Sequence, residues 1–417
     1  MQLWLIPSLY AAASVVSSLV LPRLEARYFA HDLDLSISSA QAFLSAVASG
    51  MMALTGIVFS IAFVMVQFNA IVYSPRLVVW FARDRLLFHS MGVFVATFTY
   101  SLGTLAWVDR GGNGVVPFVS CMLVASMLIA SVLLLAQLVQ RLNSLQITQV
   151  LRIIADKGRE VIHETYRAVA DTGSRKSSDA NLRRISGPFS LSIKHQGKPC
   201  AVTRIDIDGL VRQARQADCT ILVDCAVGDT LLEDTLLLRG SRAKSTLSET
   251  ELRKCIRVGD QRTLEQDPKY ALRLLVDIAV KALSPAINDP TTAVQAIDQI
   301  EDLLVRLAKC DLETSRAFDA DGTLRVVFQM PGWGDYLALA LDEIRQYGRD
   351  SIQVMRRLRS ALADLADAVG GERAQLVNAY LDHLDRSIER SDFDPQDRAA
   401  ARVEDRQGLG LSHRQED

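Results

Sequence analysis

The sequence predicts a membrane α-helical protein, with a four-helix N-terminal transmembrane domain followed by a cytosolic α+β region that is mostly helical. The first observation is charge asymmetry. Residues 1–140 contain six Arg, no Lys and five acidic residues, whereas the other 40 basic and 43 acidic residues of this 417-residue chain follow them. The second is four stretches without Asp, Glu, Lys or Arg: Met1–Pro22, Leu35–Pro75, Leu86–Val108 and Gly111–Gln140. A helix needs about 20 mostly apolar residues to cross a bilayer. We therefore expect a transmembrane domain over 1–140, with spans at about 3–21, 44–72, 87–108 and 115–139.

The first span is expected to remain in the mature protein. A secretory signal peptide begins with basic residues, and this stretch has none. Pro7 also interrupts its apolar run.

Arginines outside the spans predict the orientation. The connection between spans two and three and the segment after span four carry most of them: Arg76, Arg83, Arg85, Arg141 and Arg152. Positive charge favours the cytoplasmic side. The sequence thus predicts a multi-pass protein of the cell inner (plasma) membrane with both termini in the cytoplasm.

The second uncharged stretch, Leu35–Pro75, is too long for one simple span. Its 41 residues would measure about 60 Å as one helix, against a hydrocarbon core of about 30 Å. Part of 36–48 is therefore expected to lie outside the core, either as a separate interfacial helix or as an extension of the span.

The remainder of the chain is predicted to form four segments. Residues 141–187 form a helical extension and a flexible linker. Residues 188–240 form a small α+β unit, with strands at 201–207, 219–226 and 230–238 and a helix capped by Asp208. Residues 241–390 form a helical cytosolic domain, with helices at about 268–283, 290–309, 333–347, 350–369 and 371–390, and one further strand at 323–329. The charged residues 391–417 are expected to be a disordered tail.

The stretch SPAINDPTTAV (284–294) separates two apolar-periodic segments. Asp289 before Pro290 is typical of a helix start, because the carboxylate accepts backbone N–H bonds and proline lacks only a donor that would be unpaired. Asp267-Pro268 repeats the arrangement. The sequence predicts a tight elbow between antiparallel helices and leaves open whether it is also a binding site.

Two long segments carry a family resemblance. GIVFSIAFVMVQFNAIVYSPRLV (56–78) and QRTLEQDPKYALRLLVDIAVKALSPAINDPTTAVQAID (261–298) resemble the bacterial predicted integral membrane proteins called domain of unknown function 2254. The resemblance extends from the first span to about residue 385. It implies four N-terminal spans and a cytosolic C-terminal region, and it implies no particular reaction.

The second span offers a candidate pore or helix-packing face. Small, hydroxyl and larger side chains recur there by steps of three and four residues: Ser45, Ser49, Met52, Gly56, Ser60, Phe63 and Gln67. Such a face suits close helix packing or a pore in a homo-oligomer, and a substrate cavity within one bundle is a third interpretation. The expected spans contain no charged residue, which disfavours a proton-coupled pump. His89 is expected to be an interface residue.

A charged face offers a candidate cytosolic regulatory contact. The i,i+4 pairs Arg273–Asp277 and Asp277–Lys281 share a helix face. This face is either an ordinary charged surface or part of a site with the residues beside the two Asp-Pro pairs. That candidate site comprises Arg262, Asp277, Lys281, Asn288, Asp289 and Thr292. A small anionic ligand or a cytosolic protein is the partner considered.

Several functions are disfavoured. Phosphate-binding, zinc-protease and nucleophile-elbow motifs do not occur, so no catalytic residue, cofactor or metal site is indicated. The six cysteines contain no CxxC pair. A net charge of −2 gives no case for nucleic acid. The favoured hypothesis is a homo-oligomeric channel or permease-like protein in a lipid bilayer, with a cytosolic regulatory domain. A non-conducting scaffold or envelope-stress adaptor is the alternative, and an unrecognised membrane-face enzyme is the second.

Overall fold

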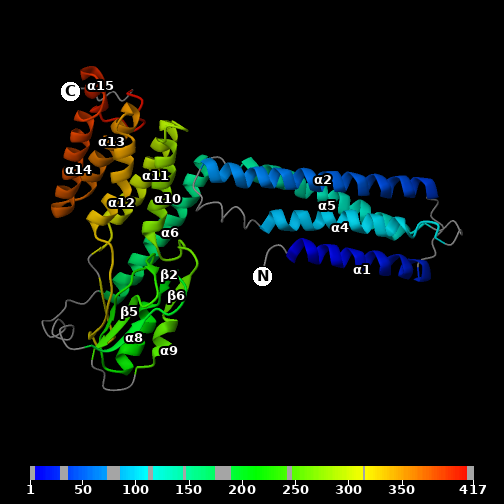
Figure 1. Ribbon diagram of the computed structural model, residues 1–417, viewed down its shortest axis with the longest axis horizontal. Coiled ribbons are helices and arrows are strands. Elements are labelled where there is room, and N and C mark those ends of the chain that lie inside the picture. Colours follow the sequence, from blue (N-terminus) through cyan, green and yellow to red (C-terminus); the bar gives the residue numbers. More distant parts are fainter. Residues whose placement is uncertain are drawn as a thin grey trace. The chain divides into compact units, whose positions relative to one another are not determined.

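A computed structural model (Figure 1) describes most of the chain. The described residues are 5–28, 36–72, 85–110, 116–143, 147–173, 189–241, 247–312 and 315–410. The chain forms two compact units, Met1–Gln146 and Ile147–Asp417, each of which is considered separately below. Within the helical extension and linker expected at 141–187, residues 147–173 form a helix, and residues 174–187 lie outside the described residues.

The first unit contains four long apolar helices, as the sequence predicts. They are α1 (Leu5–Tyr28), α2 (Ile37–Val72), α4 (Arg85–Leu105) and α5 (Phe118–Asn143). Each contains a stretch long and apolar enough to cross a membrane. Pro7 does not break α1, because it lies in the first turn, where its missing N–H has no helical partner to lose. The helix continues through Pro22, beyond the expected end of the span.

The extension of the second span is part of one continuous helix. α2 runs without interruption from Ile37 to Val72, a length of 36 residues, or about 54 Å. Residues 37–48 are therefore not a separate helix. The helix continues through this segment because Ala40, Leu44 and Val47 belong to the same apolar core as the rest of α2.

Helix α4 organises the first unit. It packs against α1, α2 and α5, and Figure 1 shows it between α1 and α2. Its inward face is unusually polar for an apolar bundle, since Ser90, Thr97, Ser101 and Thr104 are all fully buried. Small residues on α4 allow this close packing.

The second unit has a helical part and a sheet part. The helices are α6 (Ile147–Gly173), α8 (Ile207–Gln216), α9 (Glu249–Lys254), α10 (Pro268–Ala282), α11 (Pro290–Ala308), α12 (Trp333–Tyr347), α13 (Ile352–Ala368), α14 (Gly371–Glu389) and α15 (Pro395–Ala401). The five long helices expected between 268 and 390 are confirmed. Their apolar faces form one core in which α11 contacts α6, α10 and α13.

The strands form two sheets, in the orders β1-β5-β3-β8-β7 and β4-β2-β6. Their bounds are β1 (Phe189–Lys194), β2 (Cys200–Ile205), β3 (Ile221–Val223), β4 (Thr230–Leu231), β5 (Leu236–Ser241), β6 (Ile256–Gly259), β7 (Arg316–Phe318) and β8 (Leu324–Val327). The strand expected at 323–329 is confirmed as β8. It pairs in parallel with β3.

Three expectations for this region are wrong in detail. The boundary at 240 does not separate two units, because β7 and β8 complete the sheet that β1, β3 and β5 begin. The strand expected at 230–238 is two strands in different sheets, since the chain turns at Asp234, which has a φ of +63°. Helix α8 is capped by Asp206 rather than Asp208, its side chain accepting the N–H of Gly209 at 3.0 Å.

The expectation of a disordered tail from Ser391 is also wrong for the described residues. Asp394 caps α15 by accepting the N–H of Asp397 at 2.8 Å, so the Asp-Pro helix start occurs a third time. Ala401 is fully buried, and Arg356 of α13 donates to the carbonyl of Ala400 at 2.7 Å. Helix α15 is short, capped and held by a hydrogen bond from an arginine, so few apolar residues are needed to hold it in place. Residues 411–417 lie outside the described part.

A buried arginine joins the turn between β7 and β8 to the end of α8. Arg325 donates to Asp319 at 2.7 Å and to Asp218 at 2.9 Å. Asp319 also accepts the N–H groups of Asp321 and Thr323. Burial acts to raise the pKa of the Asp319 carboxyl, but Arg325 and these N–H groups outweigh it and hold that pKa below its usual value. The FDADGTL segment is therefore a structural turn.

We predict that Arg325→Leu destabilises the second unit by about 3–5 kcal/mol, because it leaves the buried Asp319 carboxylate unpaired. The control is Arg349→Leu, which removes an ion pair with Asp350 whose partners are both more than half exposed; it should cost about 0–1 kcal/mol. Thermal unfolding of the full-length protein in detergent measures both. Since the folded pKa of Asp319 is lowered, its stabilisation is present above pH 3.8 and is lost on acidification below it. Equal effects of the two variants would contradict the prediction.

Candidate functional site

The candidate face of α2 points away from the rest of its own unit. Its seven residues, Ser45, Ser49, Met52, Gly56, Ser60, Phe63 and Gln67, are all exposed. Exposure reaches 61% for Met52 and 57% for Phe63. The packing face of α2 is on the other side, where Leu44, Met51 and Val58 are buried. Among the described residues of the unit, nothing covers these seven side chains, so any helix that packs on this face comes from outside that part of the unit.

Two glycines on α2 have open surroundings. A Cβ atom added at Gly50 or at Gly56 would meet nothing within 4 Å. Near them, the hydroxyl of Ser60 donates to the carbonyl oxygen of Gly56 at 3.0 Å. Along this stretch the glycines leave space on the helix surface, and the Ser60 hydroxyl is hydrogen-bonded within the helix. Both features suit close approach of a second helix.

The close-packed polar helix pair is α1 with α4, which sequence reasoning missed. A Cβ added at Gly92 would lie 2.7 Å from the Tyr10 ring. Ser14 forms a hydrogen bond with Thr99, and Tyr10 forms one with His89 at 3.3 Å. The available signal was the spacing of Tyr10, Ser14 and Ser18 by four residues, which places them on one face of α1.

Glu25 corrects the expectation of uncharged spans. It lies at the end of the first apolar span, Leu5–Glu25, and its exposed fraction is only 6%. Its carboxylate accepts the N–H of Val119 at 2.5 Å and the N–H and hydroxyl of Ser120 at 3.1 and 3.0 Å. The span is longer than expected because α1 continues past Pro22. One carboxylate therefore lies at the end of the first candidate span.

The SPAINDP elbow is built as the sequence predicts. Asp289 accepts the N–H of Thr292 at 3.1 Å and its hydroxyl at 2.6 Å. The N–H of Asp289 donates to the carbonyl of Ala282 at 2.8 Å, which closes the turn onto the end of α10. Asn288 has a φ of +48°, a conformation in which asparagine is one of the few tolerated residues. All of these features stabilise a turn.

Arg262 does not belong to that elbow. It donates to Asp267 at 2.6 and 3.1 Å and lies over the ring of Tyr270. Asp267 begins α10, whereas Asn288 and Asp289 follow its end, so the length of the helix, about 20 Å, separates them. The candidate regulatory contact is therefore divided between opposite ends of α10.

The charged face of α10 is an intrachain contact. Arg273 forms an ion pair with Asp277 at 2.8 Å. It also donates both terminal nitrogens to Glu343 of α12, at 2.5 and 3.0 Å. Lys281 lies one turn beyond Asp277 and is half-buried. Most of this face thus holds two helices of one unit together.

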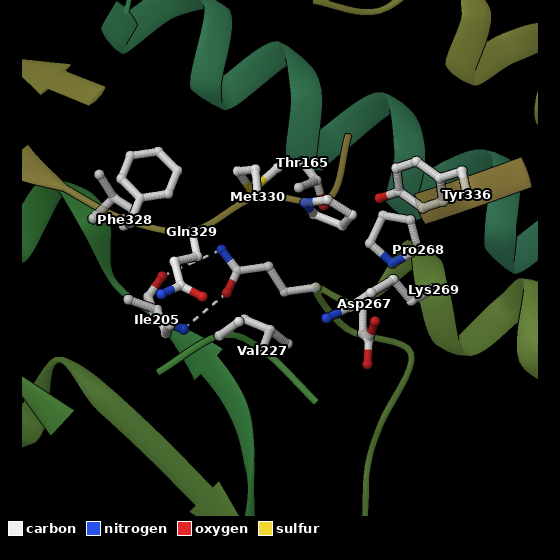
Figure 2. Close-up of a pocket in the computed structure, with 14 residues that line it drawn as sticks. Thr165, Ile205, Val227, Asp267, Pro268, Lys269, Phe328, Gln329, Met330 and Tyr336 are labelled. Atoms are coloured by element: carbon white, nitrogen blue, oxygen red, sulfur yellow. Dashed lines mark hydrogen bonds between the residues drawn. The ribbon is translucent and has the colours of Figure 1, made fainter. Parts of the chain in front are cut away.

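Figure 2 shows a pocket where the sheets meet the helices of the second unit. Its lining is Thr165, Ile205, Ile207, Ala226, Val227, Gln266, Asp267, Pro268, Lys269, Phe328, Gln329, Met330, Pro331 and Tyr336. The cavity volume is about 60 Å³, far below the roughly 300–1,000 Å³ of typical ligand sites. It has room for a few water molecules or a very small ligand.

Polar contacts around the pocket join its two sides. The amide of Gln266 pairs with both the N–H and the carbonyl of Ile205, at 2.8 and 3.2 Å. The hydroxyls of Tyr166 and Tyr336 lie 2.6 Å apart in a buried pair, and burial raises the pKa of both. Burial also raises the pKa of Asp267, which Arg262 opposes. These groups satisfy one another and do not form an exposed nucleophile and base.

The comparisons with known proteins identify the family of this chain. A family model described as "Predicted membrane protein (DUF2254)" matches residues 1–364. The chain belongs to this family. It is 28% identical over 377 residues to uncharacterized proteins of Mycobacterium bovis and Mycobacterium tuberculosis, covering 86% of this chain and 70% of theirs. No solved structure matches the chain.

We predict that the elbow tolerates Asn288→Gly and does not tolerate Asn288→Val. Glycine adopts positive φ freely, while a β-branched residue is strained there. Asp289→Ala should cost about 0.5–2 kcal/mol through loss of the N-cap. Thermal unfolding of the full-length protein compares the three. Because Asn288→Gly deletes the amide while keeping the backbone, loss of a function in that variant with unchanged stability would show that the elbow is also a site.

Proposed function

We propose that this family member is a homo-oligomeric channel or permease-like protein in which the exposed face of α2 lines or seals a path between protomers. The observation that carries the proposal is the exposure of Ser45, Ser49, Ser60 and Gln67 on one face of an uncharged helix. Facing lipid, hydroxyl and amide groups gain nothing, whereas between protomers they offer oxygen atoms to water or ions. Phe63 on the same face would act as an apolar constriction.

The proposal assigns a regulatory role to the second unit. Its helices and sheets are tied together by buried polar contacts. The pocket in Figure 2 is too small for most substrates, and a larger, open cavity of about 410 Å³ is lined by α12 and α14. Among the described residues, no group of three or more His, Cys, Asp or Glu side chains is arranged to hold a metal ion. We therefore propose a non-enzymatic unit that responds to a cytosolic protein or a small anionic ligand.

The orientation is part of the proposal. Arg85 begins α4, and Arg110 follows its end, so the arginines mark opposite ends of that helix. The positive-inside rule favours the Arg85 end as cytoplasmic, with both termini on that side of the inner membrane. Arg76 and Arg83, on which the count also depends, lie outside the described residues.

We predict ion flux through liposomes that contain the full-length protein, and loss of that flux in a Ser60→Leu, Gln67→Leu double variant. Leucine removes the polar oxygens and narrows the path. Gly50→Leu is the control, because it adds the same bulk to α2 away from the candidate face and should conduct normally. Absence of flux in the wild type, across several ions and both signs of voltage, would favour a non-conducting scaffold or adaptor and turn attention to cytosolic partners.

We predict that Gly56→Leu weakens assembly, whereas Gly50→Leu does not. The two positions are about 120° apart around α2, and both are open in the protomer, so neither change should disturb its fold. Only Gly56 lies on the face proposed to meet another protomer. Light scattering of the purified protein in detergent, with the detergent mass subtracted, measures the subunit number. If the wild type is a monomer, or if the two variants have the same subunit number, the proposed oligomer is wrong.

A further inference from the structure

A cluster of buried oxygen atoms lies inside the four-helix unit, apart from the exposed face of α2. Its charged member is Glu25, held against the first turn of α5 by three hydrogen bonds from Val119 and Ser120. An ionised carboxylate has about four acceptor positions. At least one is therefore left.

Two buried hydroxyl groups in the same region form no hydrogen bond of good geometry. Tyr100 and Thr104, one turn apart on α4, are 1% and 0% exposed. Neither Tyr100 Oη nor Thr104 Oγ1 has a hydrogen-bond partner in the described part of the chain. The Tyr100 hydroxyl approaches the hydroxyls of Ser120 and Thr104 without reaching hydrogen-bond geometry, and it lies near the Glu25 carboxylate. An unpartnered buried hydroxyl is costly, and two of them beside one carboxylate indicate a missing ligand.

We propose that Glu25, Tyr100, Thr104 and Ser120 bind a monovalent metal cation, Na⁺ in preference to larger ions. All four supply oxygen, the donor type that hard cations prefer. One carboxylate balances one positive charge, whereas protein sites for Ca²⁺ draw on several carboxylate and carbonyl oxygens. The cation would bridge α1, α4 and α5 and take the lone pairs that the hydroxyls now leave unused.

The cluster is close to one end of the bundle, which gives the ion a short route. Trp107 lies seven residues beyond Tyr100, or about 10 Å along α4 if the helix continued. Arg23 and Arg110 stack on its ring at 5.1 and 4.2 Å. Tryptophan with arginine is typical of the membrane–water boundary. The site therefore lies near that boundary rather than at the centre of the bilayer.

Cys121 provides a local measurement. It directly follows Ser120 and is 1% exposed, so its alkylation requires the start of α5 to open. The full-length protein in lipid nanodiscs is treated with N-ethylmaleimide, and the modified peptides are quantified by mass spectrometry. NaCl, KCl and LiCl are compared with N-methylglucamine chloride at equal ionic strength. Cys225, a buried thiol of the second unit whose pKa burial raises to about 12, is the internal reference.

We predict that Na⁺ slows alkylation of Cys121 several-fold, that K⁺ has a weaker effect, and that neither ion changes Cys225. A Tyr100→Phe, Thr104→Val double variant should lose the Na⁺ effect. Without Na⁺ it should melt at a higher temperature than the wild type, because it removes two unpartnered hydroxyls. The single variant Tyr100→Phe provides the same comparison if the double variant does not fold.

Three results would overturn the site. The first is a wild-type Cys121 rate that is the same in Li⁺, Na⁺, K⁺ and N-methylglucamine, which would mean that a buried water satisfies the hydroxyls. The second is a Na⁺ effect that survives in Tyr100→Phe and in the double variant. The third is an equal effect of Na⁺ on Cys121 and Cys225, which would indicate general stabilisation. The measurement does not depend on ion flux, so it stands apart from the channel proposal.

Discussion

Helix starts impose a demand that recurs throughout this protein: the first backbone N–H groups of a helix have no partner within it. In the second unit, an aspartate carboxylate accepts one of these N–H groups at the start of three helices, and the proline that follows it has no N–H to satisfy. These aspartates are Asp267, Asp289 and Asp394. In the first unit, α5 has no such residue of its own. Glu25 of α1 supplies the carboxylate across the bundle, which fixes the end of one helix against the start of another.

The need to pair the first N–H groups of a helix also explains how the sheets are joined to the helices of the second unit. Asp267 is only 1% exposed and would be expensive to bury alone, so Arg262 accompanies it. Together they leave no room for a side chain at Gly228, where an added Cβ would lie 2.5 Å from the Asp267 carboxylate. Gln266, the residue before the cap, pairs with the backbone at the end of β2. The start of α10 thus contacts the turn at Gly228 and the end of β2, and it lines part of the pocket in Figure 2.

Much of this fold could be predicted from the sequence, because the strongest signals are local. Uncharged length identified the four membrane helices, and Asp-Pro with apolar periodicity identified α10 and α11. The tail was misjudged because α15 has seven residues, too few for a periodic signal, although Asp394-Pro395 repeats the same start. Glu25 was missed since its partners are more than 90 residues away. The direction of the α2 face was equally inaccessible, because small residues occur on both sides of that helix.

The arrangement of α4 separates the two proposals made for the membrane unit. Its contacts with α1 enclose the polar cluster, while its contacts with α2 use the opposite side of α2 from the exposed serines. An ion held by Glu25 is therefore inside a protomer, and a path along α2 would be between protomers. Because α4 touches both, a cation that tightens α1, α4 and α5 would also stiffen the helix against which α2 is seated. Binding inside the bundle would then influence the outer face through packing alone, since close-packed interiors transmit strain.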